Sequence, residues 1–124
     1  MSEIKELTEK IKKFRDERDW AQFHNHKDLA LSLVLEVAEV LEHFQWKSPQ
    51  EIQEYIKQNK EEISDELADV AIYLFELADN LDIDLADSII QKLKKNTKKY
   101  PIEKAKGRIT KYNKLDQVGR NTAD

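Results

Sequence analysis

Two pairs of acidic residues stand three positions apart inside apolar stretches of the sequence. Glu36 and Glu39 lie within LVLEVAEVLEHFQW, and Glu66 and Asp69 lie within EEISDELADVAIYLFELADNL. A spacing of three places the two carboxylates of a pair within roughly 60° of each other on one face of a helix. Because apolar residues surround both pairs, the helices are expected to be largely buried, and there unpaired carboxylates repel each other and resist desolvation.

A hard divalent cation would relieve this repulsion. Mg²⁺ takes oxygen ligands, keeps several of its waters and is commonly completed by substrate phosphates. Two acidic pairs that face each other in a helical bundle therefore suggest a Mg²⁺ site, with Mn²⁺ as a substitute. In the competing interpretation the acids are solvated or paired with lysines, and the spacing alone leaves both interpretations open.

Several other chemistries are excluded by missing residues. The chain has no cysteine, which rules out thiolate catalysis, disulfides and Cys-ligated metal sites. A phosphate-binding loop of the G-x-x-x-x-G-K-[ST] type is absent. Di-iron bundles need Glu-x-x-His on two helices, and the residues three positions before His24, His26 and His43 are not glutamate. His26 and His43 carry no signal of a site, since isolated histidines are usually structural or exposed.

The elements that must position the carboxylates are predicted to be helices. Only 2 glycines and 2 prolines occur in 124 residues, 40% of which are hydrophobic, a composition that suits long helices better than a sheet with many turns. Ser48, Pro49 and Glu51 form the signature of a capping box at a helix start. We predict an all-α, four- to five-helix bundle with helices over residues 2–18, 28–45, 49–58, 60–81 and 85–99.

Charge is distributed unevenly along the chain. Residues 1–91 hold 22 acids and 10 bases, whereas residues 92–124 hold 3 acids and 11 bases. We predict a helical domain over 1–101 and a basic tail over 102–124 that is extended or partly disordered. The tail could be solvated, contact nucleic acid, fold back on the acidic part or meet the phosphates of a small ligand. The charged N-terminus and the lack of a long apolar run indicate an intracellular, cytoplasmic protein without a membrane partner.

Four segments in order resemble one known family. ERDWAQFH, LALSLVLEVAEVLEHFQWK, residues 63–79 and KLKKNTKKYP together cover roughly residues 10–101. They resemble the MazG-like, all-α nucleoside triphosphate pyrophosphohydrolases, most closely the branch that contains the dCTP pyrophosphatases. The resemblance implies a homo-oligomer, usually a tetramer built as a dimer of dimers, that cleaves (d)NTP to (d)NMP and pyrophosphate and so cleanses the nucleotide pool.

The resemblance also implies roles for individual residues. Glu36, Glu39, Glu66 and Asp69 would be the Mg²⁺ ligands, and Glu36 or Glu39 would accept the proton of the attacking water. Lys92, Asn96 and Tyr100 recur at four-residue steps on one helix face, where the resemblance places phosphate, base or sugar contacts. The full set of implied nucleotide-binding residues is Trp20, His24, Trp46, Lys47, Lys92, Asn96 and Tyr100.

One position departs from that branch. Its strictly dCTP-preferring members carry a histidine near the position of Ile11, and isoleucine cannot donate a hydrogen bond to a base. The substrate is therefore expected to be dCTP or a broader range of deoxynucleotides. The alternative function is a non-catalytic helical adaptor or nucleotide-sensing bundle with a basic tail. A stable nucleic-acid partner is not expected.

Overall fold

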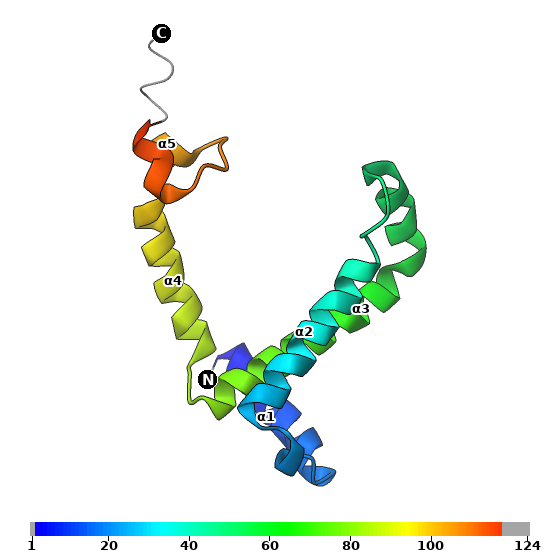
Figure 1. The fold of residues 1–124 in the computed structure, drawn as a ribbon. Helices are drawn as coiled ribbons and strands as arrows, with labels where there is room; N and C mark the ends of the chain where they lie inside the picture. The colour runs from blue at the N-terminus through cyan, green and yellow to red at the C-terminus, as the bar shows by residue number, and fades with distance from the viewer. Residues whose placement is uncertain (1, 118–124) are drawn as a thin grey trace. The chain divides into compact units, whose positions relative to one another are not determined.

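The described part of the molecule is helical throughout. The computed structural model describes residues 2–117, and every regular element among them is an α-helix or a short 3-10 helix (Figure 1). The predicted all-α class is thus confirmed. The chain divides into two compact units, residues 1–85 and 86–124. The helical domain over 1–101 and the tail over 102–124 stay predictions.

The first unit begins with two helices that polar side chains cap. Helix α1 (Glu3–Glu17) starts after Ser2, whose hydroxyl accepts from the backbone N–H of Lys5 as expected of an N-cap. A 3-10 turn, η1 (Ala21–Phe23), leads to helix α2 (His26–Glu42). We expected this helix to begin near Asp28. It begins at His26 instead, because the Asn25 side chain accepts from the backbone N–H of Asp28 and serves as the cap.

Helix α3 (Pro49–Asn80) is the longest element and carries both a strong start and a break. The predicted capping box is present, with Ser48 and Glu51 each accepting from the other's backbone N–H. The break falls at Asn59, whose backbone is not helical (φ −122°, ψ 18°) and whose side-chain amide donates to the Tyr55 carbonyl. The two helices predicted over 49–58 and 60–81 are therefore two segments of one kinked helix.

The helices of the first unit pack around α3. Helix α2 runs alongside α3 as the second arm of a helical hairpin, and α1 packs on the C-terminal part of α3 (Figure 1). Leu29 of α2 and Ala78 of α3 are the buried apolar residues of this unit among those described. The hairpin brings the acidic segment of α2 onto the acidic segment of α3, which is what positions the candidate site.

A row of apolar side chains on α2 stays uncovered. Leu31, Val34, Leu35 and Leu41 recur at helical spacing and are between 52% and 65% exposed. An exposed row of this kind is typical of a surface that another protein surface covers. None of the helices within residues 2–117 is long and apolar enough to cross a membrane.

The second unit contains more structure than expected. Helix α4 (Leu85–Lys99), all of which except Leu85 belongs to this unit, is followed by α5 (Ile102–Ala105) and a 3-10 helix, η2 (Tyr112–Gln117). Within the predicted tail, residues 102–105 and 112–117 are thus helical, the Leu115 side chain is buried, and the rings of Tyr100 and Tyr112 meet edge to face. Residues 118–124 of the predicted tail lie outside the described part.

Candidate active site

The four predicted carboxylates come from the two arms of the helical hairpin. Helix α2 supplies Glu36 and Glu39, and α3 supplies Glu66 and Asp69. Glu36 lies innermost: its Oε2 atom is buried and has no hydrogen-bond partner. Glu66 is partly buried, whereas Glu39 and Asp69 are exposed. The hairpin thus presents one deep carboxylate and three outer ones.

The charges of the other three acids act on Glu36. Burial raises the pKa of the Glu36 carboxyl above its ordinary value, and the neighbouring Glu39 raises it further. The negative charges of Asp69 and Glu66 add to the same effect. All four predicted residues are therefore close enough to interact around one carboxylate, and none of the residues that the structure describes forms a hydrogen bond with the buried oxygen.

This donor set fits a hard divalent cation in chemistry, although not as a closed cage. Carboxylate oxygens are the ligands that Mg²⁺ and similar ions take. The buried Glu36 oxygen has no hydrogen-bond partner, so a cation could contact it. Within residues 2–117, however, no group of three or more histidine or acidic side chains stands in an arrangement that would itself hold a metal ion. The carboxylates would have to adjust to an ion.

His43, which was not among the predicted site residues, contacts one of these acids. His43 is buried, its Nε2 donates to the Glu66 carboxylate, and its Nδ1 lies 2.5 Å from the Tyr55 hydroxyl. A signal for it existed in the sequence. His43 follows Glu36 by seven positions and Glu39 by four, so all three share one face of the helix that ends there.

Beside the carboxylates lies a largely apolar cavity of about 650 Å³. Its wall includes Ile11 and Phe14 of α1, and the rings of Trp20 and Phe14 meet edge to face at 5.7 Å between ring centroids. Asp69 and Tyr73 of α3 belong to the same wall. Burial raises the pKa of the Tyr73 hydroxyl, and the charges of Glu36 and Asp69 add to this. The cavity therefore adjoins the carboxylate cluster.

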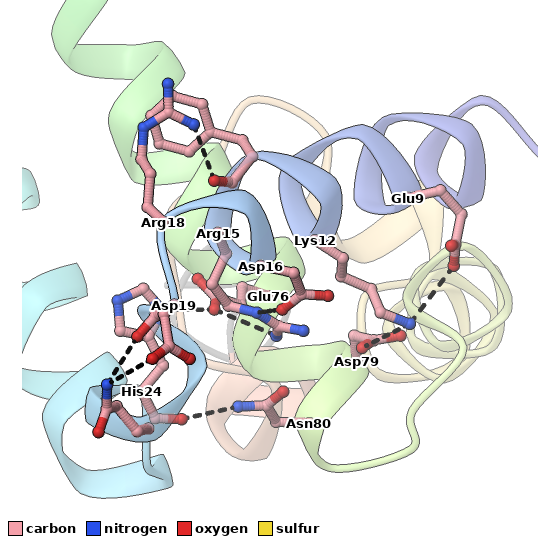
Figure 2. A network of polar contacts seen from close by, with 12 residues as sticks. Glu9, Lys12, Arg15, Asp16, Arg18, Asp19, His24, Glu76, Asp79 and Asn80 are labelled. Atoms are coloured by element: carbon pink, nitrogen blue, oxygen red, sulfur yellow. Dashed lines mark hydrogen bonds and ion pairs between the residues drawn. The ribbon is translucent and has the colours of Figure 1, made fainter.

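A buried polar network closes another part of the cavity wall. The Glu76 side chain is 2% exposed and accepts from Arg15 Nη1 at 3.4 Å and from His24 Nδ1 at 2.5 Å (Figure 2). The backbone carbonyl of His24 accepts from the Asn80 amide, which ties η1 to the end of α3. His24 was among the predicted site residues, but Arg15 and Glu76 were not, because no local pattern links positions 61 residues apart.

The remaining predicted nucleotide-binding residues are distributed over both units. Trp46 is 87% exposed, and the Lys47 ammonium group lies 4.2 Å from the centre of the Tyr55 ring. Lys92 and Asn96 lie on α4 of the second unit, and Tyr100 follows that helix. The roles of these five residues stay predictions.

The fold and the acidic hairpin place the chain in a class of all-α proteins with a carboxylate-lined site between two helices. More narrowly, the chain belongs to the MazG-like family, which it matches over residues 31–115. The family predicted from the four sequence segments is therefore confirmed. Membership points to a requirement for a divalent metal.

Individual relatives have known names. The chain is 43% identical over 104 residues to dCTP pyrophosphatase 1 from Rattus norvegicus and 39% identical over 104 residues to that from Homo sapiens, in each case over 82% of this chain. It spans only 61% of the length of these two proteins. A crystal structure of a pyrophosphatase from Archaeoglobus fulgidus is similar with a TM-score of 0.76 and 41% identity, covering 82% of this chain and 94% of that one.

Proposed function

We propose that this chain is a nucleoside triphosphate pyrophosphohydrolase that cleaves the bond between the α and β phosphates, giving a nucleoside monophosphate and pyrophosphate. The observation that carries the proposal is the buried Glu36 oxygen, which has no partner and faces three further carboxylates. Membership of the MazG-like family and the likeness to pyrophosphatases over most of the chain support the same reaction.

We assign a divalent metal, Mg²⁺ with Mn²⁺ as a substitute, to Glu36, Glu39, Glu66 and Asp69. When bound, such an ion neutralises phosphate charge, orients the triphosphate and lowers the pKa of bound water. The chain supplies the proton acceptor, for which Glu36 and Glu39 are the candidates. With pyrophosphate as the leaving group, positioning and charge stabilisation account for most of the rate.

The cavity beside the carboxylates is proposed to take the nucleobase. Trp20 offers an aromatic face for stacking, and His24 offers a ring that Glu76 holds in one orientation. Ile11 lies in the same wall and cannot hydrogen-bond to a base. We therefore propose a deoxynucleotide substrate that includes dCTP, the substrate in the name of the mammalian relatives, with a broader choice of base.

We propose that the chain assembles as a homo-oligomer, with a tetramer built as a dimer of dimers as the expected form. The uncovered row of Leu31, Val34, Leu35 and Leu41 on α2 supports this, because a second copy would remove it from water. Its place of action is proposed to be the cytoplasm, where the nucleotide pool is held.

The first experiment is pyrophosphate release from a panel of canonical and modified NTPs and dNTPs, with Mg²⁺, with Mn²⁺ and with neither. Turnover that needs the ion and yields monophosphate plus pyrophosphate is the expected result. Glu39→Gln should abolish turnover. Glu54→Gln, which changes an exposed acid on the same helix as Glu66, should leave turnover unchanged. If no nucleotide is turned over with either ion, the adaptor or nucleotide-sensing interpretation takes its place.

A further inference from the structure

His43 connects one of the proposed metal ligands to a second residue of α3. It follows the last residue of α2 and is 8% exposed. One ring nitrogen contacts the Glu66 carboxylate and the other lies 2.5 Å from the Tyr55 hydroxyl. Both polar atoms of the imidazole are thus used, which allows the ring a single orientation.

The chemistry of the partners assigns the proton on Nε2. An ionised carboxylate can only accept hydrogen bonds, so the contact with Glu66 requires an N–H on Nε2 of His43. Tyr55 is itself held in place: the Lys47 ammonium lies 4.2 Å from its ring centre, and its carbonyl accepts from the Asn59 side chain. A chain of contacts therefore runs from the kink of α3 to one oxygen of Glu66.

The exposure of Glu66 shows that this contact is not needed merely to satisfy a buried charge. The Glu66 side chain is 25% exposed, so water could solvate its carboxylate without a histidine. The His43 side chain is the more deeply buried partner, with only 9% of its surface exposed. A hydrogen bond from a deep, fixed donor to a partly exposed carboxylate restricts the orientation of that carboxylate.

We infer that His43 is a positioning residue for the divalent cation site: it holds one oxygen of Glu66 and leaves the second oxygen for the ion. This inference rests on the proposed function, because it takes Glu66 as a metal ligand. Partners that orient a ligand in this way commonly contribute 10–100-fold to metal affinity. His43 contacts neither the nucleotide nor the reacting phosphate in this scheme, so its effect should appear in ion binding first.

The test compares variants that keep one arm of the imidazole. The amide of His43→Gln reaches the position of Nε2 and can still donate to Glu66. The amide of His43→Asn is shorter and reaches only the position of Nδ1, beside Tyr55. His43→Leu fills the space and offers neither contact. Mn²⁺ binding without nucleotide is measured by the electron paramagnetic resonance signal of free Mn²⁺, and the Mg²⁺ dependence of turnover is measured in parallel.

We expect His43→Asn and His43→Leu to bind Mn²⁺ about 10–100-fold more weakly, with His43→Gln close to the wild-type protein. At saturating Mg²⁺ the value of kcat should be largely restored in all three. Equal losses in the Gln and Asn variants, or wild-type Mn²⁺ affinity in the Asn or Leu variant, would overturn the inference. Because His43→Leu alters a buried site, circular dichroism checks that this variant is folded. If His43→Leu unfolds, the comparison of His43→Gln with His43→Asn tests the inference.

The wild-type protein separates the two possible failures. If it binds no Mn²⁺ and turns over no nucleotide, the proposed function fails and this inference fails with it. If it binds Mn²⁺ and is active while the Asn variant binds equally well, only the role of His43 is refuted.

Discussion

Glu36 and Glu76 are both glutamates with buried oxygen atoms, but the chain treats them differently. Glu76 receives hydrogen bonds from Arg15 and His24, so its charge is compensated within the protein. Glu36 has a buried oxygen without a hydrogen-bond partner, and the charges that raise its pKa are those of further acids. The Glu76 carboxylate therefore links α1, η1 and α3. The Glu36 carboxylate has no positively charged partner among the described residues.

The difference separates acids that stabilise the fold from acids kept for a ligand. A buried charge is tolerated when it is paired and hydrogen-bonded, and it costs stability otherwise. The cost at Glu36 is therefore informative, because a domain tolerates such a group mainly where it serves another purpose.

The largest effect is expected from Glu36→Gln. Under the proposed function, turnover should fall by more than about 100-fold, since the loss of residues that only orient a metal ligand already costs 10–100-fold. The metal-free variant should be at least as stable as the wild-type protein, because the substitution removes repulsion with Glu39, Glu66 and Asp69. Pyrophosphate release and urea unfolding measure the two quantities. A variant that is active, or one that is much less stable, would remove the contrast with Glu76.

The opposite behaviour is expected from Glu76→Ala. It removes the acceptor of Arg15 Nη1 and of the His24 ring, while Arg15 Nε keeps its contact with Asp16 at 2.8 Å. Breaking such a buried pair costs about 3 kcal/mol in the free energy of unfolding. We place the cost at the lower end of the usual range because 12% of the Arg15 side chain remains exposed to water. Urea unfolding in EDTA measures it. Glu17→Ala, which removes an exposed acid that contacts Lys13 at 3.9 Å, is the matched control and should change little.

A smaller effect is expected from pH on the metal-free protein. The pKa of Glu36 is raised in the folded state, so the folded protein holds this proton more tightly than the unfolded chain does. The resulting stability is present below the pKa of the unfolded carboxyl and is lost as pH rises through the folded pKa. The difference in thermal midpoint between Glu36→Gln and wild type in EDTA should grow from acid to neutral pH, and Mg²⁺ should reduce it. A constant difference would contradict the assignment.

The smallest effect is expected from the exposed ion pairs near the Glu76 network. The Lys12 ammonium lies 3.5 Å from both Glu9 and Asp79 (Figure 2), but all three side chains are at least 31% exposed. Lys12→Ala should therefore lower the free energy of unfolding by less than about 1 kcal/mol, with little left at high salt. Urea unfolding at two salt concentrations checks this. A loss comparable to that of Glu76→Ala would show that burial is not what distinguishes the pairs.

Local patterns were sufficient to predict most of the helical frame. The capping box at Ser48 and the helical periodicity of the acidic segments act over a few residues, and both are present as expected. The spacing also identified the acids that interact around Glu36. The metal ligation and nucleotide contacts assigned to these and other residues stay predictions.

Contacts between distant positions could not be predicted in this way. The pairing of His43 with Glu66 joins residues 23 apart, and that of Arg15 with Glu76 joins residues 61 apart. The spacing of His43 from Glu36 and Glu39 placed it on their helix face, but no periodic pattern indicated either partner. The short helices of residues 102–117 were missed because this segment has few apolar residues. Its packing involves a single buried leucine, Leu115, and a ring contact between Tyr100 and Tyr112.

The small number of buried apolar residues has a consequence for how this protein should be handled. Among the described residues only Leu29, Ala78 and Leu115 are buried and apolar, which is little to offset the conformational entropy of a single copy. If further copies cover α2, folding and assembly become one equilibrium governed by mass action. The thermal midpoint of unfolding of the protein should then rise with protein concentration, and dilute samples should lose structure and activity together.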